Sequence, residues 1–494
     1  MTFCYNLDVR LFTLNIFMFI SKYRAKYIYK KRKRENKMLE KTFKLKEHGT
    51  NVKTEVIAGI TTFLAMAYIL AVNPNILGTV MNQDGVFIAT CLASAVATFV
   101  MGLWANYPIV LSAGLGLNAY FAYTVCLTEL SDMGANAFTV ALTAVFVEGV
   151  IFIVISIFKV REQIINGIPQ NVKYGITAGI GLFIAFIGLK GANVTVASDS
   201  TLVDLGDFSR PDVVLCMIGL LIIVVLSHYH VKGSVLIGII TTWILGIIAE
   251  KIGWYVVDVE AGVYSLIPSG VVSVSSFSGL KETAFHFNFA WAGEHIIQFI
   301  AILFSFLFVD LFDTVGTVVG VADKAKLLKE DGTLPRVGRV FMADAIGTVL
   351  GAALGTSTVT SFVESSAGVA EGGKTGLTAC VSGLLFIVAL LFSPVFLAIP
   401  SFATSPALIY VGMLMLTSIT KINFEADAAD AIGAYLAVLI MPLTYSISNG
   451  IMFAVVSWVI VKVCTKKAKD VSPVMWVVFV LFALRIASLI TNFS

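Results

Sequence analysis

Long apolar stretches separated by short polar connections recur along the chain from residue 56 onward. A helix that crosses the hydrocarbon core of a bilayer needs about 20 predominantly apolar residues. The pattern predicts fourteen spans, in two runs of seven separated by a polar loop at 251–293. The predicted spans are 56–77, 86–107, 112–127, 137–158, 173–191, 212–230, 232–250, 294–321, 338–354, 356–370, 375–397, 404–420, 428–443 and 448–464. An extra apolar helix is expected at 472–490, either as a further span or at the membrane surface.

Residues 1–55 precede the first span and have a different character. The apolar run 11–20 is too short to cross a bilayer, and the basic run 30–37 follows it. A signal peptide carries its basic residues before its apolar segment, so this order argues against one. We expect a cytoplasmic N-terminal extension, in which residues 1–37 are an artefact of start-site choice if Met38 is the true start.

The composition supports a membrane protein and narrows the chemistry. Of the 494 residues, 58% are hydrophobic and 13% are charged, whereas soluble domains carry about 25% charged residues. A water-soluble protein and a disordered chain are therefore both excluded. The six cysteines form no CxxC pair and the five histidines form no ligand pattern, so we expect no metal, no cofactor and no nucleic-acid partner. The sequence predicts an all-α polytopic protein in the lipid bilayer of the cell membrane.

The lysines and arginines of the short loops predict the orientation. Cytoplasmic loops carry an excess of these residues, and a cytoplasmic N-terminus brings every basic cluster to the same side. The clusters contain Lys159, Arg161, Lys232, Lys324, Lys326, Lys329, Arg336, Arg339, Lys374, Lys421, Lys466, Lys467 and Lys469. The acidic loop 129–132 and the loop 251–293 then lie outside.

The two runs of spans have the same layout, and because seven is odd they must cross the membrane in opposite directions. Inverted repeats are typical of transporters. The third span of each run is interrupted: residues 111–124 contain Gly114 and Gly116, and residues 354–376 contain several glycines among hydroxyl residues. Non-helical backbone is tolerated at membrane depth only against protein or a wet cavity. The paired interruptions therefore predict a binding site.

Carboxylates inside or at the ends of the predicted spans are candidates for function, because a charge within a membrane is costly. The candidates for proton coupling are Asp310, Asp313, Glu364, Glu148, Asp427 and Asp430, and Asp344 is also embedded. We expect no lysine or arginine deep in these spans, which favours a proton, a cation or a neutral hydrogen-bond donor as ligand. Structural roles remain open: these groups could cap a broken helix, tie helices together or mark a helix start.

Other residues of the interrupted segments complete the candidate substrate site. Beside Asp313 and Glu364, the candidates are Asn118, Phe121, Thr360, Ser361 and Phe362. The asparagine can donate to and accept from a heterocycle edge, or join two helices. The hydroxyls could contact substrate or satisfy backbone, and the phenylalanines could stack on a planar ligand or belong to the core. The segment GLGLNA at 114–119 matches a dinucleotide fingerprint only formally, because that motif needs a βαβ unit in water.

Five segments carry a resemblance to a known family. They are GITTFLAMAYILAVNP (59–74), AGLGLNAYFAYTV (113–125), FVDLFDTVGT (308–317), GTSTVTSFVESSAG (355–368) and MPLTYSISNGI (441–451). With these motifs the chain resembles the nucleobase/cation symporters, in the AzgA-like branch of purine permeases for adenine, guanine and hypoxanthine. The resemblance runs from Met38 to Cys464.

The resemblance implies two domains with substrate between them. A core domain would comprise 56–158 and 294–397, a gate domain would comprise 173–250 and 404–464, and a homodimer would form through the gate. By motif, Asp313 and Glu364 would bind the base and Asn118 would lie beside them. Asp427 or Asp430 matches a gate-region acid more loosely, and this chain has Gly433 where the family usually has proline.

The function that follows is proton-coupled uptake of purine nucleobases by alternating access, without enzymatic activity. Glu364 would accept N–H groups of the base, and Asp313 would bind a second N–H or hold the transported proton. Two other classes stay open. An anion exchanger could share the inverted-repeat architecture, although the embedded carboxylates disfavour it, and a cation channel could use acidic rings for selectivity.

Overall fold

The structure is a computed structural model that describes residues 38–157, 169–258, 263–273, 275–327, 334–425 and 427–492. The predictions for residues 1–37, Lys159, Arg161 and Lys329 lie outside these ranges. The N-terminal half contains α2 (Val52–Met66), α3 (Ile69–Leu77), α4 (Gln83–Val100), α6 (Ala137–Ile157), α8 (Gln170–Gly191), α9 (Pro211–His228) and α10 (Ser234–Lys251). The C-terminal half contains α11 (Leu280–Thr283), α12 (Phe289–Glu294), α13 (Ile296–Lys324), α14 (Val337–Leu354), α16 (Gly376–Ala389), α17 (Ser393–Leu397), α18 (Ser401–Leu416), α19 (Ala428–Leu443), α20 (Ile447–Cys464) and α21 (Pro473–Asn492).

The helical membrane class is confirmed. Within the described ranges, ten helices are long and apolar enough to cross a membrane, and two shorter apolar stretches, Ile296–Leu311 and Ala428–Leu443, accompany them. Fourteen spans and an inverted repeat stay predictions. The strictly all-α expectation needs correction, because the chain also forms two small antiparallel sheets. One is the exposed hairpin of β2 (Thr195–Ser198) and β3 (Leu202–Leu205), and the other is buried at the candidate site.

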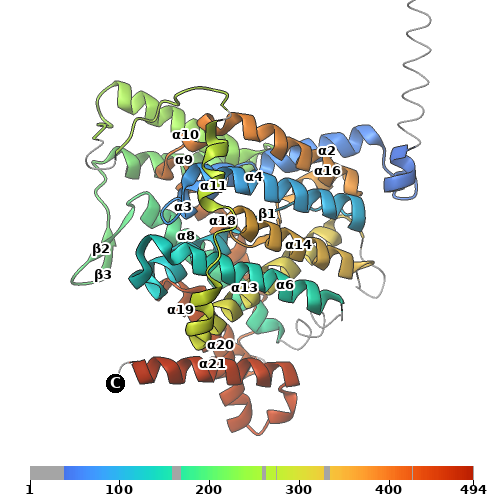
Figure 1. The fold of residues 1–494 in the computed structure, drawn as a ribbon, viewed down its shortest axis with the longest axis vertical. Coiled ribbons are helices and arrows are strands. Elements are labelled where there is room, and N and C mark those ends of the chain that lie inside the picture. Colours follow the sequence, from blue (N-terminus) through green and yellow to red (C-terminus); the bar gives the residue numbers. More distant parts are fainter. Residues whose placement is uncertain are drawn as a thin grey trace, which may run out of the picture.

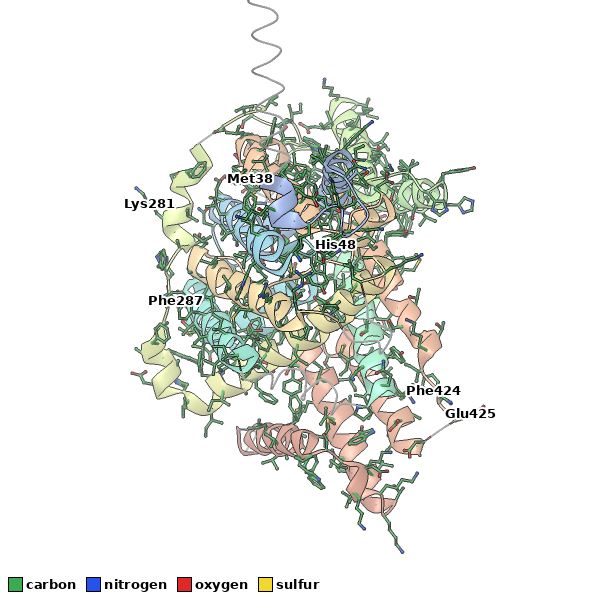
Figure 2. The ribbon with its side chains drawn as sticks, turned by 90° about the vertical axis from the view of Figure 1, so that its right-hand side faces the viewer. Met38, His48, Lys281, Phe287, Phe424 and Glu425 are labelled. Atoms are coloured by element: carbon green, nitrogen blue, oxygen red, sulfur yellow. The ribbon has the colours of Figure 1, made fainter. Side chains whose placement is uncertain are left out.

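The helices pack in two groups. In the first, α4, α14 and α6 lie side by side (Figure 1), with α2, α3, α13 and α16 packed around them. In the second, α8 packs on α18 and α19, while α9 and α10 pack on α18, and α20 packs on α19. The segment with Lys281 and Phe287 runs along one flank of the molecule, opposite the flank with Phe424 and Glu425 (Figure 2).

A buried carboxylate joins the start of α2 to the start of α16. Glu55 Oε1 accepts from the backbone N–H of Lys374 at 2.9 Å, and Oε2 accepts from the hydroxyls of Thr375 and Thr378 at 2.8 and 2.6 Å. The N–H groups of Thr375 and Thr378 also point at Oε2, at 3.3 and 3.2 Å. The first N–H groups of a helix lack intrahelical partners, so Glu55 satisfies the N-terminus of α16 from another span.

The C-terminal helix α21 packs against both groups. It lies against α20 of the second group. The Phe482 ring contacts the rings of Phe304 and Phe308 on α13 of the first group, at centroid distances of 5.5 and 6.2 Å. Met475, Val478 and Phe482 are buried, whereas Val477 and Val480 are exposed. The helix therefore presents one face to the protein and an apolar face outward.

Candidate functional site

The two interrupted segments meet in the interior as a short antiparallel sheet. β1 (Leu111–Ala113) pairs with β4 (Val359–Ser361), with Ser112 opposite Thr360. Beyond the strands, Gly114 N–H donates to the Thr358 carbonyl and Phe362 N–H donates to the Val110 carbonyl, both at 3.0 Å. The short helices α5 (Leu115–Ala119) and α15 (Ser365–Ala370) follow the strands. Pairing supplies the backbone hydrogen bonds that non-helical chain requires inside a membrane.

Hydroxyl side chains satisfy the outer edges of this sheet. Thr98 Oγ1 accepts from the Leu111 N–H at 3.1 Å, Ser94 and Ser112 share a hydrogen bond of 2.7 Å, and the Thr348 hydroxyl donates to the Val359 carbonyl at 3.1 Å. These donors and acceptors come from α4 and α14, which enclose the sheet. The hydroxyl-rich sequence therefore has a backbone role here in addition to any contact with a ligand.

Asp313 and Glu364 approach each other beside the sheet. Asp313 lies on α13, and a Cβ added to Gly114 would be 3.6 Å from its Oδ2. Glu364 immediately precedes α15 and accepts a hydrogen bond of 2.5 Å from the Tyr68 hydroxyl. Asp313 lies within electrostatic range of both Asp344 and Glu364. Both acidic candidates for substrate binding therefore belong to one locality, together with a tyrosine that the sequence analysis missed.

A second group of buried oxygens lies behind Asp313. The Thr314 hydroxyl is 3.1 Å from Asp310 Oδ1, 3.0 Å from Asp344 Oδ2 and 2.8 Å from Thr360 Oγ1. A hydroxyl has one proton and two acceptor lone pairs. If Thr360 donates to Thr314 and Thr314 donates to one carboxylate, the contact with the other carboxylate is a hydrogen bond only when that carboxyl carries a proton. The arrangement can hold a proton close to the candidate substrate site.

Asn118 and Glu148 both connect to the segment that precedes β4. The Ser357 hydroxyl donates to Asn118 Oδ1, and Asn118 Nδ2 lies 3.5 Å from the Ala113 carbonyl. The Thr358 hydroxyl donates to Glu148 Oε2 at 2.9 Å. Asn118 thus joins the two interrupted segments, and Glu148 ties α6 to the second of them.

The remaining substrate candidates are mostly enclosed. Phe121 is fully buried, with its ring 6.2 Å from the ring of Phe306. Phe362 and Ser361 are 6% and 2% exposed, and Thr360 contacts Thr314. Among the described residues, the Ser361 hydroxyl has no hydrogen-bond partner. Phe362 and Ser361 are adjacent in sequence to the Glu364 turn, whereas Phe121 lies in a core contact.

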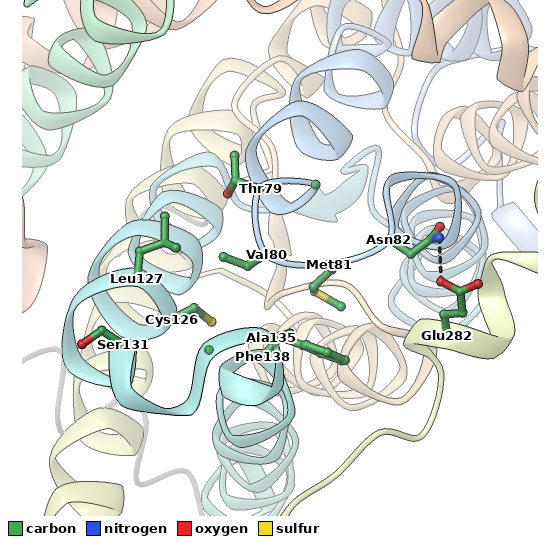
Figure 3. A pocket seen from close by; sticks show the side chains of 12 residues that line it. Thr79, Val80, Met81, Asn82, Cys126, Leu127, Ser131, Ala135, Phe138 and Glu282 are labelled. Atoms are coloured by element: carbon green, nitrogen blue, oxygen red, sulfur yellow. Dashed lines mark hydrogen bonds between the residues drawn. The ribbon is translucent and has the colours of Figure 1, made fainter. Parts of the chain in front are cut away.

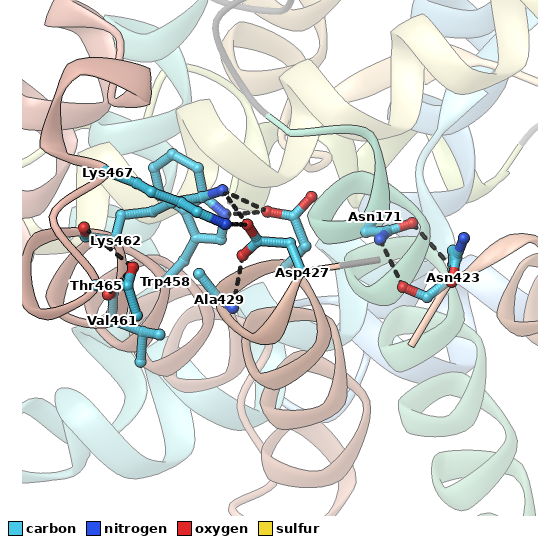
Figure 4. Close-up of polar contacts among 10 residues, drawn as sticks. Asn171, Asn423, Asp427, Ala429, Trp458, Val461, Lys462, Thr465 and Lys467 are labelled. Carbon is cyan, nitrogen blue, oxygen red and sulfur yellow. Dashed lines mark hydrogen bonds and ion pairs between the residues drawn. The ribbon is translucent and has the colours of Figure 1, made fainter. Parts of the chain in front are cut away.

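Asp427 and Asp430 lie in a separate ion-pair cluster at the start of α19 (Figure 4). Asp427 Oδ2 is 2.8 Å from Lys467 Nζ and 3.0 Å from Lys462 Nζ, and Asp430 Oδ1 accepts from the Trp458 indole at 2.7 Å. The bonds from Lys467 and Lys462 hold the pKa of Asp427 well below its ordinary value. Lys462 is 6% exposed and lies in the last turn of α20, so it is buried near the end of a span and not deep within one. This cluster joins α19 to α20.

A cavity of about 520 Å³ lies elsewhere, between the loop 78–82, the segment 126–135 and Phe138 of α6 (Figure 3). Asn82 Nδ2 donates to Glu282 at its edge, at 2.7 Å. None of the predicted substrate residues lines this cavity. In the predicted orientation its lining loops face outside.

Sequence reasoning missed Tyr68, Thr314 and Glu55. Tyr68 lies at the break between α2 and α3 within a span predicted as continuous. A tyrosine in an apolar run resembles an ordinary core or interface residue, and threonine is common in helices. Glu55 directly precedes the predicted start of the first span at residue 56, so a search for carboxylates inside the spans does not include it.

Comparison with known proteins gives the family. The family model described as "Permease family" matches residues 53–453. The adenine permease AdeP of Escherichia coli is 41% identical over 450 residues, covering 91% of this chain and 96% of that protein. The guanine/hypoxanthine permease PbuO of Bacillus subtilis is 43% identical over 449 residues, covering 90% and 99%.

A solved structure supports the fold. The transmembrane domain of a cyanobacterial bicarbonate transporter, BicA, superposes with a TM-score of 0.61 at 13% identity, covering 81% of this chain and 97% of that one. The curated relatives are permeases, so a membrane transporter rather than an enzyme is confirmed. The residues matched by the family model include the β1–β4 sheet, Asp313, Glu364 and Tyr68. The chain therefore belongs to the permease family.

Proposed function

We propose that this permease carries purine nucleobases into the cell together with protons. The observation that carries the proposal is that the Glu364–Tyr68 pair and Asp313 both lie beside the β1–β4 sheet, the latter against Gly114. The names of the relatives AdeP and PbuO, which are permeases for adenine and for guanine and hypoxanthine, support this substrate class.

The chemistry of the site suits a flat ligand with several N–H groups. A carboxylate accepts N–H groups strongly, and Glu364 presents one at the start of α15. Asp313, across from Gly114, accepts a further N–H group or holds the transported proton. Because Gly114 has no side chain, the backbone at the start of α5 comes close to Asp313.

Proton coupling follows from the cost of carrying bare carboxylates through a closed state. Removing an ion from water costs several kcal/mol in proteins, so neutralising a carboxylate before closure eases the transition. Asp310 and Asp344, joined through Thr314, support this step because their geometry accommodates a proton. The ion-paired Asp427 is less suited to it.

Alternating access is the motion that we assign to the two helix groups. The first group corresponds to a core domain of 56–158 and 294–397, and the second to a gate of 173–250 and 404–464. Their separate packing supports this division. Fourteen spans in two inverted repeats, a cytoplasmic N-terminus and a homodimer through the gate belong to the same proposal.

The test is uptake of radiolabelled hypoxanthine and adenine by cells that express the full chain, with competing unlabelled bases and with or without a protonophore. We expect saturable uptake that the protonophore abolishes. Glu364→Ala should abolish uptake while the protein stays in the membrane. Glu371→Gln is the matched control, because Glu371 pairs with Lys232 at 2.6 Å in a partly exposed ion pair.

Further arms of the experiment separate coupling from binding and address the other classes. Asp313→Asn should bind the base but lose protonophore-sensitive accumulation. If Glu364→Ala took up hypoxanthine normally, its assigned role would be wrong. Competition by bicarbonate instead of bases would favour an anion exchanger, and unsaturated ion conductance without base uptake would favour a channel.

A further inference from the structure

Tyr68 occupies an unusual place in the first span. The helix is interrupted at Ala67 and Tyr68, where Leu70 N–H donates to the Ala67 carbonyl at 3.1 Å and Ala71 N–H donates to the Tyr68 carbonyl at 3.0 Å. These tighter turns separate α2 from α3. Because α3 packs on α5 and β1, the break lies against the buried sheet and directs a fully buried tyrosine toward it.

The Tyr68 hydroxyl contacts one of the two site carboxylates and is within electrostatic range of the other. It donates to Glu364 Oε1 at 2.5 Å, and its electrostatic interactions include Asp313 as well as Glu364. A phenol has one proton to donate and oxygen lone pairs to accept with. The ring is held by the surrounding core, so the hydroxyl has a fixed position while its proton can turn to a new acceptor.

We propose that Tyr68 is a specificity-determining residue of this permease, acting as the hydrogen-bond donor that reads the acceptor next to the N–H group bound by Glu364. This inference rests on the proposed function. In the empty site the Tyr68 proton points to Glu364. When a base enters, Glu364 accepts its N–H group and the Tyr68 proton turns to the neighbouring ring nitrogen or carbonyl oxygen of the base.

The purine bases share an N–H donor next to an acceptor, which is the arrangement that Glu364 and Tyr68 together would bind. Hypoxanthine and guanine present the N1–H donor beside the O6 acceptor, and adenine presents the 6-amino donor beside the N1 acceptor. A carboxylate alone would accept any N–H group. An adjacent donor adds selectivity, because a polar group buried without its partner loses the free energy of a hydrogen bond.

The experiment compares pairs of bases that differ only at the acceptor. Hypoxanthine is paired with 6-mercaptopurine, in which sulfur, a weak acceptor, replaces O6 and N1–H is kept. Adenine is paired with 1-deazaadenine, in which carbon replaces N1 and the amino group is kept. Inhibition constants for uptake are measured with wild type and with Tyr68→Phe in the full chain.

The matched control is Tyr107→Phe. Tyr107 is also buried, at 1% exposure, and its hydroxyl donates to the Pro335 carbonyl, so this variant loses a comparable buried hydrogen bond away from the carboxylates. We expect the wild type to prefer the transported base over its analogue by about tenfold or more, the equivalent of about 1.4 kcal/mol. Tyr68→Phe should raise KM for that base by a similar factor, keep Vmax and lose the preference, whereas Tyr107→Phe should keep both the preference and KM.

Several outcomes overturn the inference. If Tyr68→Phe lowers Vmax and thermal stability but keeps KM and the preference, Tyr68 is only structural. If Tyr68→Phe is not produced, the wild type still decides, because equal affinity for both members of each pair excludes a donor at this position. Failure of the wild type to take up any purine overturns the proposed function together with this inference, whereas purine uptake without discrimination overturns the inference alone.

Discussion

Replacing Gly114 by alanine tests whether the space between the two interrupted segments is part of the binding site. Gly114 has φ −70° and ψ 125°, which alanine adopts without strain, so the effect is one of space alone. The new Cβ would lie 2.8 Å from Thr360 Cγ2 and 3.1 Å from Leu117 Cδ1. Carbon atoms in contact prefer about 4 Å. The Leu117 side chain can turn away, but Thr360 is held by its bond to Thr314.

Forcing a methyl group into a packed interior typically costs about 1–3 kcal/mol. If the segments separate to relieve the clash, the site loses its geometry and KM for the base should rise about 5- to 150-fold. Gly338→Ala is the matched control, because nothing lies within 4 Å of a Cβ at that position. Combining Gly114→Ala with Thr360→Ser removes the clashing methyl and keeps the hydroxyl, so KM should recover.

The measurement is concentration-dependent base uptake, normalised to the protein in the membrane. A Gly114→Ala variant with the KM and Vmax of Gly338→Ala would refute the reasoning. A double variant no better than Gly114→Ala would show that contact with Thr360 is not the cause.

Three further predictions follow from other contacts. Glu55→Gln replaces one accepting oxygen by an NH2 group and leaves at least one donor at the start of α16 without an acceptor, so the free energy of unfolding should fall by about 1–3 kcal/mol. An unchanged melting temperature in detergent would contradict this. Thr314→Val should reduce proton-driven accumulation by about tenfold, the loss of one hydrogen bond, while Thr314→Ser retains it; equal accumulation by both variants would exclude the shared-proton geometry. Asp427→Asn keeps an N-cap but loses its ion pairs, and should reduce stability by about 1 kcal/mol at pH 7. Because the pKa of Asp427 is lowered in the folded state, its contribution is present above the ordinary value of 3.8 and is lost as pH falls below it, so the difference between Asp427→Asn and wild type should shrink in thermal melts below about pH 4.

The interruption of two spans was predictable from the sequence, but their pairing was not. Glycines and hydroxyl residues at 111–124 and 354–376 are poor lipid-facing helix, and the structure places β1 and β4 within these ranges. The register of Ser112 with Thr360 depends on contacts between residues about 250 positions apart in the chain. Local preference carries no information on such a register.

The candidate site residues likewise include some that the sequence indicates and some that it does not. Asp313 and Glu364 could be singled out as candidates because an embedded carboxylate is rare and costly in a membrane. Tyr68 and Thr314 could not, because both residue types are ordinary in apolar helices. Only their contacts with Glu364 and Asp344 in the structure mark them as candidates. The partners of Lys462 were not predictable either, because Asp427 and Asp430, which its buried side chain reaches from the last turn of α20, lie on another helix.

The C-terminal helix α21 has a consequence for any rearrangement of the two helix groups. It contacts α20, and its Phe482 ring contacts the rings of Phe304 and Phe308 on α13. In a hinge or sliding movement between the two groups, α21 can move with only one of them. Its contacts with either α20 or α13 must then break. If α21 stays with α20 as the two groups move apart, the ring contacts of Phe482 with Phe304 and Phe308 must break, and the rate at which they break sets an upper limit on the rate of that movement.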